Sequence, residues 1–253
     1  MTPPRTKKEY LKQIVSEKNR WFRPLSDDEK KLGFLGWHER GYLPHCDFPG
    51  LVQFVTFRLA DSMPASRRVE WEKLLEIEDI RIRRTKLEEY LDRGIGSCCL
   101  RDKQCAQWAV DSLLYFHDDR YELLAWCIMP NHVHVLLHVR QTPLSKIVQG
   151  WKINVTGRLR QLRVGELEVS AKLHGKLLNA PRRSSALQSL WQREYWDTFM
   201  RNEEQEQKAI KYIEANPVKA KLCRAPDNWA FSSACFRDKF GRLSLPEEMV
   251  YGP

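Results

Sequence analysis

The chain has 253 residues, of which 42% are hydrophobic, and this is enough apolar material for one large domain or two small ones. Its 42 Lys and Arg residues outnumber its 33 Asp and Glu residues and give a formal charge of +9, which favours a polyanionic partner such as nucleic acid. The seven cysteines include no Cys-x-x-Cys pair, and no run approaches the roughly 18 apolar residues of a membrane span. These features argue against a disulfide framework, a zinc ribbon and a membrane protein, so we expect reduced thiols in a cytoplasmic protein.

The first third of the chain predicts a helix, an arm, a strand and a helical segment. Residues 7–19 carry apolar side chains at helical spacing, and residues 21–50 form an aromatic stretch with Pro and Gly that reads as an extended arm. Residues 51–59 alternate and are rich in β-branched and aromatic types, which predicts the first core strand. Residues 66–93 are dense in charge with apolar residues at helical spacing. We expect one long helix or a helical hairpin there, ended by Gly94 and inserted into the core.

The middle of the chain predicts a helix and a pair of strands. Residues 103–117 place Cys105, Trp108 and Leu113 on one helical stripe. Residues 121–128 and 132–139 are β-rich and are separated by a turn at Pro130 and Asn131, which predicts a hairpin.

The last third predicts a helix from Pro143 to about residue 162, a loop over residues 164–189 and a strand within residues 190–199. The resulting order of strand, helix, strand, strand, helix and strand matches the ferredoxin-like arrangement. We therefore predict an α+β fold, a ferredoxin-like βαββαβ sheet with helices on one face. The other face of the sheet would then be open to a ligand.

The predicted fold also carries a helical insertion and N- and C-terminal extensions. We expect a single domain over residues 1–253, with an N-terminal helix and arm over residues 1–47 and the insertion over residues 66–100. A last helix is expected over residues 201–217. No internal repeat or low-complexity segment interrupts this organisation.

Two histidines on one predicted strand form a candidate metal site. Because strand residues alternate between faces, Val133 and its alternates face the core while His132 and His134 point together to the other side. Neutral imidazole nitrogens at this spacing can share one metal ion. The alternative is a pair of surface histidines on an exposed strand. His138 lies on the same face but too far along to share the ion comfortably, so we expect it to have another partner or to face a substrate.

The last predicted helix carries a second candidate pair. Asn202 is a good N-cap, and Pro217 is expected to end the helix near Asn216. Tyr212 and Asn216 are four residues apart and therefore share one helix face. A tyrosine there can act as a nucleophile beside an amide oxygen that suits Mg²⁺ or Mn²⁺. The alternative is a half-buried tyrosine followed by an asparagine that caps the helix.

At these segments the chain resembles the single-tyrosine HUH transposases, in particular the REP-associated tyrosine transposases of bacteria. The resemblance covers most of residues 38–235. It rests on Met-Pro-Asn-His-Val-His-Val-Leu at residues 129–136, on Trp-Gln-Arg-Glu-Tyr-Trp-Asp at residues 191–197, and on the tyrosine segment at residues 212–220. Residues 40–45 and 56–59 also resemble those of a longer subgroup.

The resemblance implies the ferredoxin-like fold, a divalent metal (Mg²⁺ or Mn²⁺) and cleavage of single-stranded DNA near a hairpin. Carried over by position, His132 and His134 become metal ligands, Tyr212 the nucleophile and Asn216 the third ligand, where family members often have Gln. Tyrosine attack would give a 5′-phosphotyrosine and a free 3′-OH, which another strand could reverse without ATP. The family also implies a bacterial protein in the cytoplasm, associated with the nucleoid. The resemblance assigns no role to the helical insertion.

Basic residues gather in the C-terminal half and could follow a DNA backbone, so that affinity would fall with salt. The candidates for DNA binding are Lys152, Arg182, Arg183, Arg193, Arg201, Lys208, Lys211 and Lys219. Trp151, Trp191 or Trp196 could stack on bases. The alternative is a solvated face with core tryptophans.

Two other functions stay open from the sequence. One is a nucleic-acid-binding module on the same fold without transposase activity, and the other is a metal-dependent hydrolase that uses bound water. The expected partner is single-stranded or hairpin DNA, with no membrane. The sequence leaves both a monomer and a homodimer open.

Overall fold

The computed structural model describes residues 23–40, 43–77, 79–174 and 189–250. Its centre is a four-stranded antiparallel sheet in the order β4-β5-β3-β6. The strands are β3 (Val52–Arg58), β4 (Tyr121–Ile128), β5 (His132–Val139) and β6 (Trp196–Phe199). The first and third strands along the chain lie in the middle, which is the ferredoxin-like order. The predicted α+β fold is thus confirmed.

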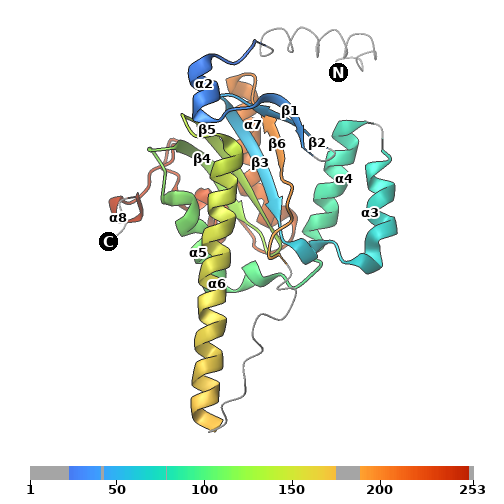
Figure 1. The fold of residues 1–253 in the computed structure, drawn as a ribbon, viewed down its shortest axis with the longest axis vertical. Coiled ribbons are helices and arrows are strands. Elements are labelled where there is room, and N and C mark those ends of the chain that lie inside the picture. Colours follow the sequence, from blue (N-terminus) through green and yellow to red (C-terminus); the bar gives the residue numbers. More distant parts are fainter. Residues whose placement is uncertain (1–22, 41–42, 78, 175–188, 251–253) are drawn as a thin grey trace.

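Helices α5 (Lys103–Leu114) and α6 (Leu144–His174) cover one face of this sheet (Figure 1). Asp102 caps α5 by accepting a hydrogen bond from the Cys105 backbone N–H at 3.0 Å. The buried core between helices and sheet includes Val110 of α5, Trp151 of α6 and Val135 of β5. The predicted alternation along β5 is therefore correct, with its valines in the core.

Helix α7 (Glu203–Lys219) covers the opposite face, the one that carries the histidines. It buries Ala209 and Ile213 in a cluster with Phe54 and Leu136 of the sheet. Figure 1 shows the sheet between α6 on one side and α7 on the other. The expectation that the histidine face is free of helices is wrong, because the same alternation places Leu136 there. Burying apolar surface of this kind under a helix stabilises the fold by about 25 cal/mol per Å² removed from water.

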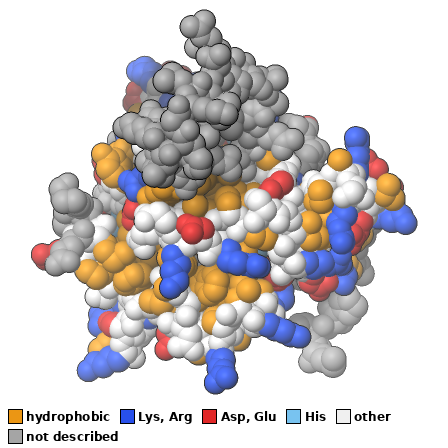
Figure 2. Space-filling view, turned by 90° about the horizontal axis from the view of Figure 1, so that it is seen from below, with side chains coloured by type: hydrophobic (Ala, Val, Ile, Leu, Met, Phe, Trp, Pro, Cys, Tyr) orange, Lys and Arg blue, Asp and Glu red, His pale blue; other side chains and the backbone are white. Residues whose placement is uncertain are grey.

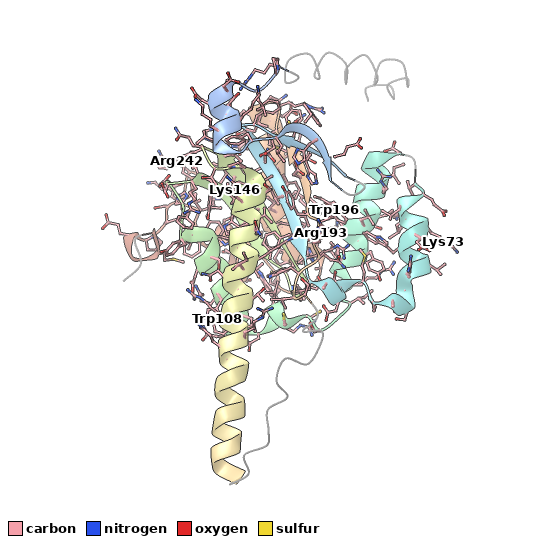
Figure 3. All side chains as sticks on the ribbon, viewed as in Figure 1. Lys73, Trp108, Lys146, Arg193, Trp196 and Arg242 are labelled. Carbon is pink, nitrogen blue, oxygen red and sulfur yellow. The ribbon has the colours of Figure 1, made fainter. Side chains whose placement is uncertain are left out.

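The segment before α5 is a helical hairpin, one of its two predicted forms. Its helices are α3 (Arg68–Leu75) and α4 (Ile80–Asp92). Trp71 of α3 stacks on Trp196 of β6 with ring centroids 6.0 Å apart, and α4 buries Leu87 and Leu91. Trp196 is labelled in Figure 3, where it lies between the sheet and this hairpin. The insertion therefore packs against the edge of the sheet at β6.

The predicted extended arm folds partly into a two-stranded sheet. Helix α2 (Asp27–Leu32) precedes the antiparallel strands β1 (Gly36–Arg40) and β2 (Leu43–Asp47). His45 Nδ1 of β2 hydrogen-bonds a carboxylate oxygen of Asp197 in β6, and both side chains are buried. The expected helix over residues 7–19 lies outside the described residues.

Two helices are longer than predicted. Residues 164–174, expected in a loop, continue α6, and their Glu, Leu, Ala and Lys residues favour a helix. Helix α7 passes through Pro217 and ends at Lys219. Pro217 removes one hydrogen bond near the helix end, but the backbone N–H groups of Ala220 and Leu222 still bond the carbonyls of Asn216 and Pro217 at 2.9 and 2.8 Å. None of the helices in the described ranges is both long and apolar enough to cross a bilayer.

Candidate functional site

His132 and His134 point toward each other on the α7 side of β5. Both side chains are buried, and their Nε2 atoms are 3.1 Å apart. The ring planes are nearly perpendicular, with centroids 4.6 Å apart. The predicted convergence of the two imidazoles is thus present, but in a buried site and not on an open face.

Hydrogen bonds to the other ring nitrogens orient both imidazoles. Asn131 donates its side-chain N–H groups to the carbonyls of Leu91 at 3.2 Å and Ile95 at 3.1 Å, so its Oδ1 faces Nδ1 of His132 at 2.7 Å. Because an amide oxygen only accepts, Nδ1 of neutral His132 carries the proton and Nε2 carries the lone pair. Nδ1 of His134 lies 2.8 Å from the hydroxyl of Thr56, which can donate or accept.

The electrostatic environment keeps His132 neutral. Burial lowers the pKa of His132 well below its ordinary value, and the neighbouring His134 and Arg58 lower this pKa further. A neutral imidazole with a free Nε2 lone pair is the form that binds a metal ion.

The spacing of the two imidazoles is compatible with a shared divalent ion. Adjacent ligands on an octahedral ion lie about 3.0 Å apart when each bond is about 2.1 Å, which agrees with the Nε2 separation. Asn216 is buried, and its amide makes no hydrogen bond of good geometry to the described residues, although it lies close enough to the Tyr212 hydroxyl to lower the pKa of that phenol. Such an amide oxygen suits Mg²⁺ or Mn²⁺. Within the described ranges, no three His, Cys, Asp or Glu side chains form a metal-binding group, so a third protein donor would be of another type.

Tyr212 lies on α7 next to the histidine pair. Its ring centroid is 5.9 Å from those of His134 and Phe54. Its hydroxyl donates a hydrogen bond of 2.6 Å to Oε2 of Glu88, a buried residue of α4. Burial raises the pKa of Tyr212 well above its usual range, and the charge of Glu88 and this hydrogen bond raise it further. The phenol is therefore protonated at neutral pH.

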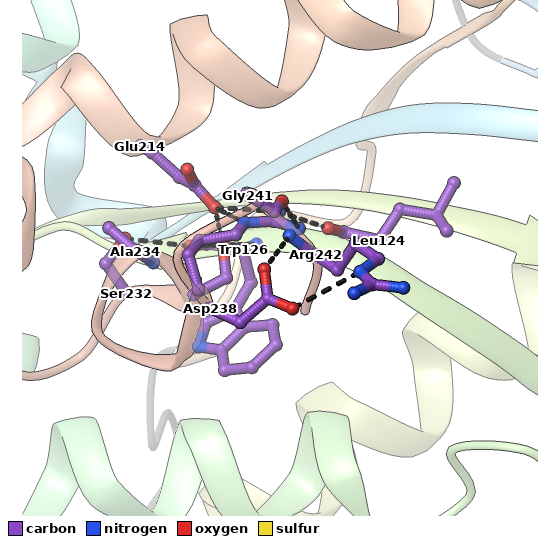
Figure 4. A network of polar contacts seen from close by, with 10 residues as sticks. Leu124, Trp126, Glu214, Ser232, Ala234, Asp238, Gly241 and Arg242 are labelled. Carbon is purple, nitrogen blue, oxygen red and sulfur yellow. Dashed lines mark hydrogen bonds and ion pairs between the residues drawn. The ribbon is translucent and has the colours of Figure 1, made fainter. Parts of the chain in front are cut away.

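Polar contacts with the C-terminal segment hold α7 on the sheet (Figure 4). Glu214 of α7 accepts hydrogen bonds from the Ser233 hydroxyl at 2.6 Å and from Nε of Arg237 at 2.8 Å. Arg237 also donates to the carbonyl of Leu124 in β4 at 2.6 Å, and Ser233 accepts from the Trp126 backbone N–H at 3.0 Å. The segment before α8 (Glu247–Val250) thus joins the tyrosine helix to β4.

Comparisons with known proteins show similarity to transposases. Residues 113–216 match the model of a family described as transposase IS200 like. A protein of Haemophilus influenzae, inferred to be a REP-associated tyrosine transposase, is 25% identical over 113 residues. The resemblance to REP-associated tyrosine transposases is confirmed.

The matches have limited extent. The alignment with the H. influenzae transposase spans 45% of this chain and 58% of that relative, little more than half its length. A solved structure of a REP-associated tyrosine transposase bound to a REP hairpin aligns with 78% of this chain and 81% of its own, with 17% identity and a TM-score of 0.44. The transposase family match contains β5 and most of α7 but excludes the α3–α4 hairpin.

Among the described residues, the basic side chains predicted to bind DNA lie in two separate places. Lys152 donates to the backbone carbonyls of Gln192 at 2.8 Å and Arg193 at 3.2 Å. With Arg193 it lines a pocket of about 200 Å³ on the α6 side of the sheet, which also includes Tyr195. The histidine pair lies on the other side.

The remaining described candidates lie at or on α7. Arg201, Lys208, Lys211 and Lys219 are exposed, and Lys219 forms an ion pair with Asp92 at 3.8 Å. In the view from below, Lys and Arg side chains are spread over the face among apolar and acidic ones (Figure 2). Arg182 and Arg183 lie outside the described residues. Direct DNA contact by any of these side chains stays a prediction.

The aromatic candidates for base stacking have different surroundings. Trp151 and Trp191 are buried in the core, so packing explains them. Trp196 is half-buried between Trp71 and the guanidinium of Arg58, which lies 5.9 Å from its ring centroid.

Sequence reasoning missed two contacts of the site. Thr56 is opposite His134 in the antiparallel register, and only that register reveals the pair. Glu88 lies in the insertion, 124 positions from Tyr212, and no local pattern connects them. His138 has a partner of its own, Glu122 at 3.8 Å, as expected for a histidine outside the metal pair.

Proposed function

We propose that this chain cleaves and rejoins single-stranded DNA at hairpin-containing repeats, with Tyr212 as the nucleophile. The observation that carries the proposal is the convergence of the Tyr212 ring with the buried His132 and His134 pair. The family match spans all three residues. The H. influenzae relative and the hairpin-bound structure make REP-type hairpins the first substrate to test.

The chain's own residues supply the parts of a phosphodiester transfer. His132, His134 and Asn216 would hold a divalent ion, which when bound polarises the scissile phosphate and offsets its developing charge. Tyr212 would attack phosphorus in line and form a 5′-phosphotyrosine, with release of a 3′-OH. Burial lowers the pKa of His132, so this imidazole stays neutral and able to act as a ligand. The phosphotyrosine link conserves the free energy of the broken phosphodiester bond, so a second 3′-OH can rejoin DNA without ATP.

A covalent trapping experiment tests the proposal. The full chain is incubated with Mn²⁺ or Mg²⁺ and heat-denatured, end-labelled fragments of the host genome, which include any hairpin repeat it uses. We expect a DNA–protein complex that survives denaturant and is lost in Tyr212→Phe while DNA binding stays. Tyr115→Phe is the matched control, because Tyr115 is 72% exposed and lies on α5's side of the molecule.

The other outcomes separate the alternative functions. Salt-sensitive DNA binding without any adduct in the wild type would favour a binding module without transposase activity. Cleavage that persists in Tyr212→Phe, with no adduct, would favour a hydrolase that uses bound water. Either result would overturn the proposed chemistry.

A further inference from the structure

The α3–α4 hairpin contacts residues of the candidate site. The backbone carbonyl of Leu91 in α4 and that of Ile95, just after it, hold the Asn131 amide, which in turn orients His132. The same helix buries Leu87 and Tyr90. Its position relative to β5 is therefore fixed at several points.

Within this hairpin, Glu88 accepts a hydrogen bond from the hydroxyl of Tyr212. Its side chain is buried at 7% exposure, although Glu is rarely buried without a partner. The Tyr212 O–H donates to Oε2 of Glu88 at 2.6 Å, within the range of a charge-assisted hydrogen bond. The nearest neighbours along the helix do not share this contact: Glu89 pairs with Lys86 at 2.9 Å, and Asp92 pairs with Lys219 at 3.8 Å.

We propose that Glu88 is the general base that takes the Tyr212 proton as the phenol oxygen attacks phosphorus. This inference rests on the proposed function, since it assigns a residue to the same reaction. A general base must lie within about 2.6–3.2 Å of the oxygen whose proton it removes, and Glu88 meets this condition. The transposase family match begins at residue 113, so it does not extend to Glu88, which the α3–α4 hairpin supplies.

As the bond from Tyr212 Oη to phosphorus forms, the hydroxyl proton moves to Glu88 Oε2. The bond from phosphorus to the 3′-oxygen breaks, and that oxygen leaves with the electron pair and gains a proton from water. In the rejoining step a 3′-OH attacks the phosphotyrosine and loses its proton to water. The bond from phosphorus to the phenol oxygen breaks, and Glu88 returns its proton to that oxygen.

The contact between Tyr212 and Glu88 suits proton transfer. A phenol is a weak nucleophile until its proton leaves. A carboxylate at 2.6 Å from the hydroxyl can take this proton as the bond to phosphorus forms. A hydrogen bond that only satisfies two buried groups would have no such effect on rate, and this difference can be measured.

The first test compares Glu88→Gln with Glu89→Gln, using the oligonucleotide recovered from the wild-type adduct and Mn²⁺. Glutamine keeps the size and a hydrogen-bonding oxygen but loses the basic carboxylate. We expect adduct formation to slow by about 10²–10⁴-fold in Glu88→Gln with unchanged DNA binding, and to stay at the wild-type rate in Glu89→Gln. Glu88→Asp, which keeps the carboxylate, should recover part of the rate.

A second test distinguishes a general base from a structural contact. Tyr212 is replaced by a fluorotyrosine, whose phenol has a lower pKa and needs less help from a base. We expect the ratio of the wild-type rate to the Glu88→Gln rate to shrink at least tenfold in this background. A merely structural contact would leave the ratio unchanged.

The outcomes separate this inference from the proposed function. An adduct that depends on Tyr212 but forms at the wild-type rate, or faster, in Glu88→Gln would overturn the role of Glu88 and leave the function standing. If Glu88→Gln fails to fold, the inference is overturned by Glu88→Asp when that variant folds and shows no defect. Absence of any adduct in the wild type would overturn both.

Discussion

The imidazoles and the phenol of the candidate site are positioned in different ways. His132 and His134 lie two residues apart on one strand, and their outer partners Thr56 and Asn131 come from the paired strand and the preceding turn. Tyr212 comes from a helix on top of the sheet, and its hydroxyl partner comes from an inserted hairpin. The pair of nitrogens is thus a local property of the sheet, whereas the nucleophile depends on contacts between distant segments.

The largest effect is expected when both imidazoles of the histidine pair are removed. We expect His132→Ala with His134→Ala to lower metal-dependent adduct formation by about 10³-fold or more, because the double variant removes both nitrogen donors of the proposed metal site. DNA binding should remain. The rate is measured by gel assay of the trapped complex. His138→Ala is the control, because His138 lies on the same strand face at 39% side-chain exposure. A double variant that still forms the adduct would contradict the assignment.

A smaller effect is expected when a residue that hydrogen-bonds one of the imidazoles is replaced. We expect Thr56→Val to weaken Mn²⁺ binding by about 10–100-fold, because the valine cannot hydrogen-bond Nδ1 of His134. The measurement is the Mn²⁺ concentration at half-maximal adduct formation, supported by calorimetry. Thr156→Val on α6 serves as the control. An unchanged Mn²⁺ midpoint would mean that Thr56 contributes only packing.

A further prediction concerns the pH dependence of stability at the contacts between α4 and α7. Burial raises the pKa of Asp92 to about 6, and its partial partner Lys219 only moderates this. The pKa of an Asp side chain in the unfolded protein is about 3.9, so Asp92 binds its proton more tightly in the folded state. The resulting contribution to the free energy of unfolding is present below a pH of about 4 and is lost as pH rises through about 6. This contribution is about 2–3 kcal/mol.

Removal of the titrating group should cancel that pH dependence. We expect Asp92→Asn to be more stable relative to the wild type at pH 7.5 than at pH 4, as measured by urea unfolding at both values. Asp119→Asn, at a side chain 74% exposed, should show no such difference. Equal stability differences at the two pH values would show that burial does not raise the pKa of Asp92.

The part of the site that follows from local periodicity could be predicted from the sequence. Alternation along residues 132–139 correctly separated the core valines from the histidines, and the order of elements correctly gave the sheet. The same alternation also placed Leu136 beside the histidines, but it did not show that Ala209 and Ile213 would cover it. Packing partners of a helix stripe are a tertiary property, which a single stripe does not specify.

The errors at helix ends have a similar cause. Pro217 favours a helix end, but the loss of one hydrogen bond costs little when only two helical residues follow it. The contact of Glu88 with Tyr212 is harder to anticipate, because it joins an inserted segment to a helix far along the chain. The roles of Tyr212, Asn216 and the basic residues stay predictions until they are tested.

The contacts of Glu214 with Ser233 and Arg237 anchor the tyrosine helix to its own chain. One molecule therefore contains the phenol, the carboxylate and both imidazoles that the proposed reaction uses. If the reaction uses these groups of one molecule, we predict that the rate of adduct formation per molecule is unchanged by dilution.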